Sequence, residues 1–276
     1  MGRVRKTAFS ELPPDADEVR LTAADGVPIS AVHVAARDRS LDLALVVVHG
    51  FTGAWQEERV WRVADRLRSF GGVVAVDQRG HGRSGGQSSV GDTEVFDVAA
   101  AVAWARELGY ARVVTVGFSL GGAIVVREAA LLADGPGRVD AVVAVSAPAF
   151  WYYRGTKVTR LVHHLVLTRH GRLLLRARGT RVSGAGWTAP EPVPPAQAAA
   201  RLAVPILVVH GDVDRYFPTE HAQALHAAAR SAGVRSDLWI EEGFGHAEGA
   251  ATPELVDRIG RWVRECVLPA DGSQPT

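Results

Sequence analysis

Cysteine is almost absent from this sequence, and its scarcity excludes several kinds of site. The chain of 276 residues contains one cysteine, Cys266, so it can form neither an internal disulfide nor a cysteine-based metal cluster. Long apolar runs are missing as well. The longest, Ala141–Tyr153, is interrupted by Ser146 and Pro148, and it falls short of the ~18 apolar residues that a membrane-spanning helix needs.

A strong net charge is also missing. Lys plus Arg is 31 and Asp plus Glu is 30, a formal net charge of +1. The sequence pI of about 8.1 is below the range typical of nucleic-acid-binding domains, so we expect no nucleic-acid partner. The N-terminal residues include Arg3, Arg5 and Lys6 but no apolar stretch of the signal-peptide type. We therefore expect a cytoplasmic protein.

What the sequence does contain is an alternation of short Val-rich runs and helical patterns. The runs are apolar throughout, which is typical of strands buried on both faces of a parallel sheet. They are Ala44–Val48, Val73–Val76, Val113–Val116, Ala141–Val145, Ile206–Val209 and Leu238–Ile240. Helical patterns cover Trp55–Phe70, Thr93–Leu108, Gly121–Leu132, Thr219–Ser231 and Pro253–Val267. This order predicts an α/β fold with a doubly wound, mostly parallel sheet.

Two segments depart from this rhythm. Val19–Leu21 and Pro28–Val34 flank Asp25-Gly26, a hairpin signal that predicts an antiparallel edge. Between Val145 and Val204 there is no run of strand length. We expect residues 147–203 to be a helical cap inserted into one core domain, which residues 1–146 and 204–276 form.

The strongest motif is Gly117-Phe118-Ser119-Leu120-Gly121-Gly122, which follows an expected strand and begins an expected helix. This is the context of a G-x-S-x-G nucleophile elbow. The flanking glycines allow a tight strand-to-helix turn, and the helix N-terminus behind Ser119 favours a developing negative charge. The bland alternative is an ordinary glycine-rich turn.

With this motif the sequence resembles the α/β-hydrolase superfamily over nearly the whole chain, from about Val19 to Val267. Four segments carry the resemblance in the family's order: His49-Gly50-Phe51-Thr52-Gly53, Asp77 to Ser84, the elbow, and the pair His210 to Asp214 and Gly245-His246. Within the superfamily it resembles the small bacterial esterase and lysophospholipase-like members. The resemblance implies an α/β-hydrolase fold and a serine nucleophile.

A serine hydroxyl needs a base that a third group orients. His246 lies between the last expected strand and the last expected helix, which matches the chain order of Ser, acid and His. The acid has two candidates, Asp212 and Asp214. The family's spacing from Gly211 favours Asp214 as the group that orients His246, and we expect Asp212 to cap the loop. His163, His164, His170, His221 and His226 are expected to be solvated.

The resemblance also implies an oxyanion hole. Its donors would be the backbone N–H groups of Phe51 and Leu120. The segment Asp77 to Ser84 holds Asp, Arg, His and Ser, but in the family it is a structural loop. We expect neither a metal nor another cofactor.

The expected cap has an unusual charge. From Ala141 to Pro190 there are eight Lys or Arg residues and no Asp or Glu, so the rest of the chain sums to −7. An apolar stripe at helical spacing runs from Val158 to Val166. Such a helix can contact an anionic membrane surface or an acidic substrate, or simply cover the site with a solvated basic face. Phe150, Trp151 and Tyr152 begin the insertion, directly after the expected strand Ala141–Val145. We call this start of the insertion the cap root. The three aromatic residues are candidates for the substrate pocket or for packing at the cap root.

Together these motifs predict a serine hydrolase that cleaves a carboxylic ester through an acyl-enzyme on Ser119. The expected substrate is a small acyl ester, either anionic or lipid-like. A thioesterase or acyltransferase, a carbon–carbon bond hydrolase and a cofactor-free haloperoxidase-like enzyme would use the same triad. A ligand-binding protein without turnover stays open as a different class. Substrate identity and oligomeric state are not indicated by the sequence.

Overall fold

The structure, a computed structural model, describes residues 12–187 and 190–268. Its centre is an eight-stranded sheet in the order β1-β2-β4-β3-β5-β6-β7-β8. The strands are β1 (Ala16–Thr22), β2 (Pro28–Val34), β3 (Leu43–Val48), β4 (Gly72–Val76), β5 (Arg112–Phe118), β6 (Ala141–Val145), β7 (Ile206–Gly211) and β8 (Ser236–Glu241). β2 pairs antiparallel with β1 and β4, and the remaining pairs are parallel. The expected mostly parallel sheet with an antiparallel edge is confirmed.

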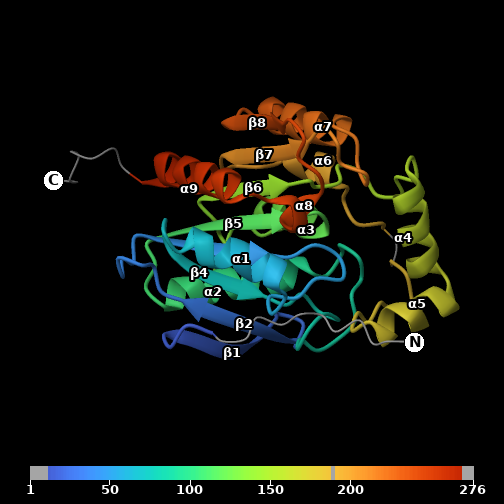
Figure 1. The fold of residues 1–276 in the computed structure, drawn as a ribbon, viewed down its shortest axis with the longest axis horizontal. Coiled ribbons are helices and arrows are strands. Elements are labelled where there is room, and N and C mark those ends of the chain that lie inside the picture. Colours follow the sequence, from blue (N-terminus) through green and yellow to red (C-terminus); the bar gives the residue numbers. More distant parts are fainter. Residues whose placement is uncertain (1–11, 188–189, 269–276) are drawn as a thin grey trace.

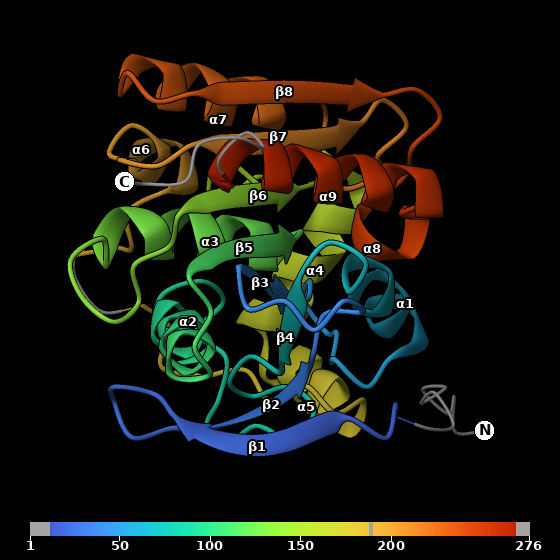
Figure 2. The same ribbon diagram turned by 90° about the vertical axis from the view of Figure 1, so that its left-hand side faces the viewer.

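The valine-rich strands are buried because helices cover both faces of the sheet (Figure 2). On one face lie α1 (Glu58–Leu67), α8 (Ala247–Ala250) and α9 (Pro253–Val267). On the other lie α2 (Val95–Glu107), α3 (Leu120–Leu131), α6 (Pro195–Ala199) and α7 (Glu220–Ser231). Alternate residues of each strand contribute to the two apolar layers, which explains the continuous apolar runs of the sequence.

The remaining helices, α4 (Lys157–Leu167) and α5 (Arg169–Ala177), stand beyond the carboxyl ends of the parallel strands (Figure 1). They meet at a corner because Thr168 ends α4 and its hydroxyl accepts the Gly171 N–H at the start of α5. α4 buries only one side chain, Thr159, whereas α3 in the core is buried along most of its length.

Only part of the segment expected to form the cap, residues 147–203, stands apart from the sheet and its covering helices. Its last helix, α6, packs against α3 and α7, and Ala198 and Ala199 are part of the core. The division into a core and a cap at residues 147–203 stays a prediction. The basic N-terminal side chains Arg3, Arg5 and Lys6 lie outside the described residues. Among the described residues, no helix is long and apolar enough to cross a membrane, and the cytoplasmic location stays a prediction.

Candidate active site

Ser119 lies at the turn between β5 and α3, in a backbone conformation with φ 52° and ψ −119° that side chains rarely adopt. Two glycines make this turn possible. A Cβ on Gly117 would collide with the carbonyl oxygen of Gly121, and a Cβ on Gly121 would collide with the carbonyl oxygens at the end of β3. The close approach lets β5 pass directly into the helix, with the Ser119 side chain directed into the space beyond the strand ends.

His246 and Asp214 reach Ser119 from the loops that follow β8 and β7. The Nδ1 atom of His246 is 2.7 Å from Asp214 Oδ2, and its Nε2 atom is 2.9 Å from Ser119 Oγ. Because a carboxylate has no proton to donate, Nδ1–H is the donor to Asp214. The lone pair of Nε2 therefore accepts the Ser119 hydroxyl. The structure thus brings together the three residues that the sequence singled out.

The two aspartates of the β7 loop have different surroundings. The Asp214 side chain is 1% exposed, and its Oδ1 atom accepts the N–H groups of Tyr216 at 2.7 Å and Phe217 at 3.2 Å. These donors hold the carboxylate in place while Oδ2 faces His246. Asp212 Oδ1 accepts the Gly243 N–H at 2.7 Å, so it joins the two loops that carry Asp214 and His246.

The turn after β3 lies against the nucleophile. A Cβ on Gly50 would be 3.1 Å from the Ser119 Cβ. The His49 ring braces this turn, since its Nδ1–H donates to the Gly50 carbonyl at 2.7 Å and its Nε2 accepts the Gln78 N–H at 3.1 Å. Phe51 and Leu120 both border the space at Ser119. Leu120 is the first residue of α3, so its N–H has no acceptor within the helix. Their role as oxyanion donors stays a prediction.

A cavity of about 650 Å³ opens at Ser119 and His246. All five positions of the apolar stripe in α4 line it: Val158, Leu161, Val162, Leu165 and Val166. The three candidate aromatic residues line it as well. The Trp151 indole donates to the Pro192 carbonyl at 3.0 Å, the Tyr152 hydroxyl donates to Glu191 at 3.0 Å, and Phe150 is about half exposed. The cavity wall is thus largely apolar, with a polar end at the triad.

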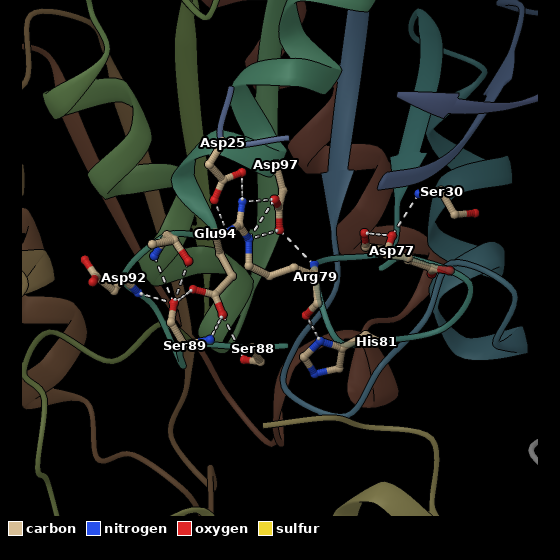
Figure 3. A network of polar contacts seen from close by, with 12 residues as sticks. Asp25, Ser30, Asp77, Arg79, His81, Ser88, Ser89, Asp92, Glu94 and Asp97 are labelled. Atoms are coloured by element: carbon tan, nitrogen blue, oxygen red, sulfur yellow. Dashed lines mark hydrogen bonds and ion pairs between the residues drawn. The ribbon is translucent and has the colours of Figure 1, made fainter. Parts of the chain in front are cut away.

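The loop before α2 joins this cavity to the cap, and Figure 3 shows its centre, the buried carboxylate of Glu94. Glu94 accepts the Ser88 hydroxyl and the N–H groups of Ser89, Val90 and Gly91 at 2.8 to 3.0 Å. Ser88, Ser89 and Val90 line the cavity. The backbone of Ser88 pairs with that of residues 181–183, and the Trp187 indole donates to the Ser89 carbonyl at 2.6 Å.

The segment from Asp77 to Ser84 has contacts typical of a structural loop. Asp77 is fully buried, and its carboxylate accepts the N–H groups of Trp55 and Arg83 at 2.8 Å each. Burial raises the pKa of Asp77 to about 6. Arg79 forms ion pairs with Asp25 and Asp97, and these are also drawn in Figure 3.

Comparisons with known proteins agree with this architecture. The family model described as the alpha/beta hydrolase fold matches residues 44–158, which include Ser119 and the turn after β3. An esterase from Pyrococcus furiosus has a similar structure, with a TM-score of 0.72 and 20% identity, covering 95% of this chain and 98% of the esterase. The chain therefore has the α/β-hydrolase fold, and its sequence is similar to that family over residues 44–158.

Two further proteins are similar to this chain. A monoacylglycerol lipase from Mycolicibacterium smegmatis (strain ATCC 700084 / mc(2)155) is 29% identical over 259 residues, which cover 79% of this chain and 87% of that lipase. The structure of Est1E from Butyrivibrio proteoclasticus with ferulic acid bound has a TM-score of 0.65 and 20% identity. The matched region covers 91% of this chain and 100% of Est1E.

One expectation about the histidines was wrong. His221 is buried, not solvated. Its Nδ1 accepts the Ala149 N–H at 3.0 Å, and its ring packs at a T-shaped angle against Tyr153, with centroids 4.5 Å apart. Burial lowers the pKa of His221 to about 4. The reason is its place on α7, where the cap root covers it. His164 and His170 are exposed as expected.

Sequence reasoning missed two features beside the triad. The Tyr216 ring stacks on the His246 ring, with centroids 4.0 Å apart and planes 18° apart. Glu248, two residues after His246, is buried in the cavity wall, with its Oε1 3.8 Å from Arg59 Nε. The only sequence signal that Tyr216 lies beside the triad was its position two residues after Asp214.

Proposed function

We propose that this α/β-hydrolase cleaves a carboxylic ester through an acyl-enzyme on Ser119. The observation that carries the proposal is the chain of hydrogen bonds from Asp214 through His246 to Ser119, which ends at the wall of a largely apolar cavity. A serine in this arrangement has a base within reach and a carboxylate that orients the base. The similarity to a monoacylglycerol lipase and to esterases supports the same reaction class.

In the first half of the proposed reaction, Ser119 Oγ attacks the ester carbonyl carbon while His246 Nε2 takes the hydroxyl proton. Asp214 stabilises the imidazolium that forms but does not take the proton itself. The negative charge on the former carbonyl oxygen would receive hydrogen bonds from the N–H groups of Phe51 and Leu120. The ester C–O bond then breaks, and His246 gives its proton to the departing alcohol.

In the second half, water attacks the acyl carbon and His246 takes one proton from it. The bond to Ser119 Oγ breaks, and the proton returns to that oxygen. One ester and one water thus give one alcohol and one carboxylic acid, and the enzyme returns to its starting state. No step needs a metal or an oxidant.

The cavity supports a lipid-like acyl ester as substrate. A volume of about 650 Å³ and the apolar stripe of α4 suit an acyl chain or an apolar alcohol. The wall also includes Arg59 and Arg172, which would suit an anionic group on the same molecule. The substrate panel should therefore include neutral and anionic esters of matched chain length.

The test is steady-state hydrolysis of acetyl, octanoyl and dodecanoyl esters by the wild type, Ser119→Ala and His246→Ala, with His226→Ala as a matched histidine control on α7. We expect ester hydrolysis by the wild type and a loss of at least about 10³-fold in both triad variants. The His226→Ala variant should keep wild-type rates. Faster turnover of the matched thioesters would move the assignment to a thioesterase.

A covalent probe separates an enzyme from a binding protein. A fluorophosphonate should label the wild type at Ser119, and the label should disappear in His246→Ala. A wild-type protein that takes up no label and cleaves no ester in the panel would contradict the proposed function.

A further inference from the structure

The outer surface of the two cap helices exposes leucines among basic side chains. We call this surface the α4–α5 face. It consists of the exposed residues Lys157, Arg160, Leu161, Leu167, Arg169, Leu173, Leu174 and Arg176. Leu173 is 64% exposed and Leu174 is 45% exposed. Exposed leucines are unremarkable when they are scattered singly, but a group on one face marks an interaction site.

The cavity does not account for the leucines of α5. Leu161 and Leu167 border the cavity, but Leu173 and Leu174 lie outside its wall. α5 has nine residues and buries only Gly171 and Leu175. Two adjacent leucines on so short a helix therefore remain exposed in the described chain, Leu173 by about two thirds and Leu174 by almost half.

The charge of this region has one sign. Residues 141–190 hold eight basic side chains and no carboxylate. The arginines of the core, by contrast, pair with nearby acids, as Arg106 does with Asp140 and Arg258 with Glu241. Within the described residues, none of the eight cap cations is in an ion pair of this kind. Arg160, Arg172 and Arg181 donate to backbone carbonyls, but no carboxylate of the described residues neutralises the positive charge of the cap.

We propose that the α4–α5 face binds the surface of an anionic lipid bilayer. Leucines can enter the boundary between headgroups and acyl chains, while Arg and Lys keep their charges at the lipid phosphates. Anionic lipids attract such a cluster electrostatically. A second copy of this chain would not suit the α4–α5 face as a partner, because two faces of equal positive charge would repel each other.

Binding in this orientation would place the cavity at the lipid. Leu161 and Leu167 belong both to the α4–α5 face and to the cavity wall. A lipid held in the bilayer could then reach Ser119 without crossing bulk water. The surface interaction itself requires no turnover, so it can be tested whether or not the proposed hydrolysis is correct.

The experiment is co-sedimentation of the full chain with vesicles. One set is phosphatidylcholine alone, and the other is phosphatidylcholine with phosphatidylglycerol, each at low and high salt. We expect binding to the anionic vesicles, and we expect high salt to weaken it. Leu173→Ser/Leu174→Ser and Arg169→Glu/Arg176→Glu should each lower the partition coefficient by about tenfold or more.

Controls of matched chemistry lie elsewhere on the surface. Leu41→Ser and Arg20→Glu/Arg261→Glu change exposed residues outside the cap. Their partition coefficients on anionic vesicles should stay within about twofold of the wild-type value. Both cap variants change residues outside the cavity wall, so their rates on a water-soluble acetyl ester should also stay within about twofold. A thermal melt checks the fold independently of activity.

Three outcomes would overturn the proposal. The first is a wild-type protein that does not sediment with anionic vesicles. The second is binding that both cap variants retain in full. The third is a lipid-free dimer that Leu173→Ser/Leu174→Ser dissociates, which would assign the face to a second copy of the chain.

Discussion

The triad region and the α4–α5 face differ in how their side chains are held. The Asp214 side chain is buried and accepts two backbone N–H groups besides its bond to His246. On the α4–α5 face, by contrast, Leu173 is 64% exposed and Leu174 is 45% exposed. The contrast separates two tasks. Bond chemistry needs groups fixed in one geometry, whereas recognition of a lipid or its surface needs apolar area that stays uncovered until the partner arrives.

The largest expected effect tests the triad region, whose side chains are held in one geometry. Asp214→Asn should lower kcat/KM for an ester by about 10⁴-fold, because an amide can donate to Nδ1 and so favour the wrong tautomer of His246. Asp212→Asn is the matched control in the same loop. Its amide oxygen can still accept the Gly243 N–H, and its rate should stay near that of the wild type. Equal losses in the two variants would contradict the choice of Asp214.

The second prediction tests the apolar wall that the cap provides. Val162→Asp places a carboxylate in the cavity and should lower kcat/KM for a dodecanoyl ester by about 10²-fold, with little change for the acetyl ester. His164→Asp puts the same group on the exposed side of α4 and should not discriminate between the two esters. Comparable kinetics for the two variants on both esters would show that the acyl chain does not lie along α4.

The smallest effect concerns His221, which lies where the cap root meets the core. Its folded pKa of about 4 is below the ordinary value of 6.5, so the unfolded chain takes up the proton first as the pH falls. The contribution of the neutral ring to stability is therefore complete above about pH 6.5 and is lost progressively toward pH 4. At about pH 5 the loss is roughly 2 kcal/mol.

This pH dependence can be measured by urea unfolding at about pH 7.5 and about pH 5. His221→Asn keeps an acceptor for the Ala149 N–H but has no ionisable ring. The wild type should lose roughly 2 kcal/mol more stability than this variant on acidification. A wild-type protein that loses no more than His221→Asn would show that the ring is already protonated or exposed in the folded state.

Local patterns predicted the fold well, because a parallel sheet buried on both faces leaves a direct mark on the sequence. The runs Pro28–Val34 and Ala141–Val145 match β2 and β6 residue for residue. The other strands extend one to three residues beyond their apolar runs at one or both ends, since polar residues such as Arg112 and Ser236 continue the pairing.

For the candidate site, the sequence was informative where residue type and loop position were linked. Ser119, Asp214 and His246 follow strand ends that must meet at one edge of the sheet, and the structure brings them together. Their catalytic roles stay predictions. The burial of His221 depends on how the cap root folds over α7, and the stacking of Tyr216 on His246 depends on how the loops after β7 and β8 meet. No periodicity of a single helix carries that information.

The most direct test of the central claim is the acyl-enzyme itself. Wild-type protein is mixed with an octanoyl ester, quenched in acid within the first turnovers and analysed by intact-protein and peptide mass spectrometry. We expect a mass increase of one octanoyl group, located on Ser119 and absent from Ser119→Ala. Turnover of the ester with an acyl group found on another residue, or with an adduct that persists in Ser119→Ala, would contradict it.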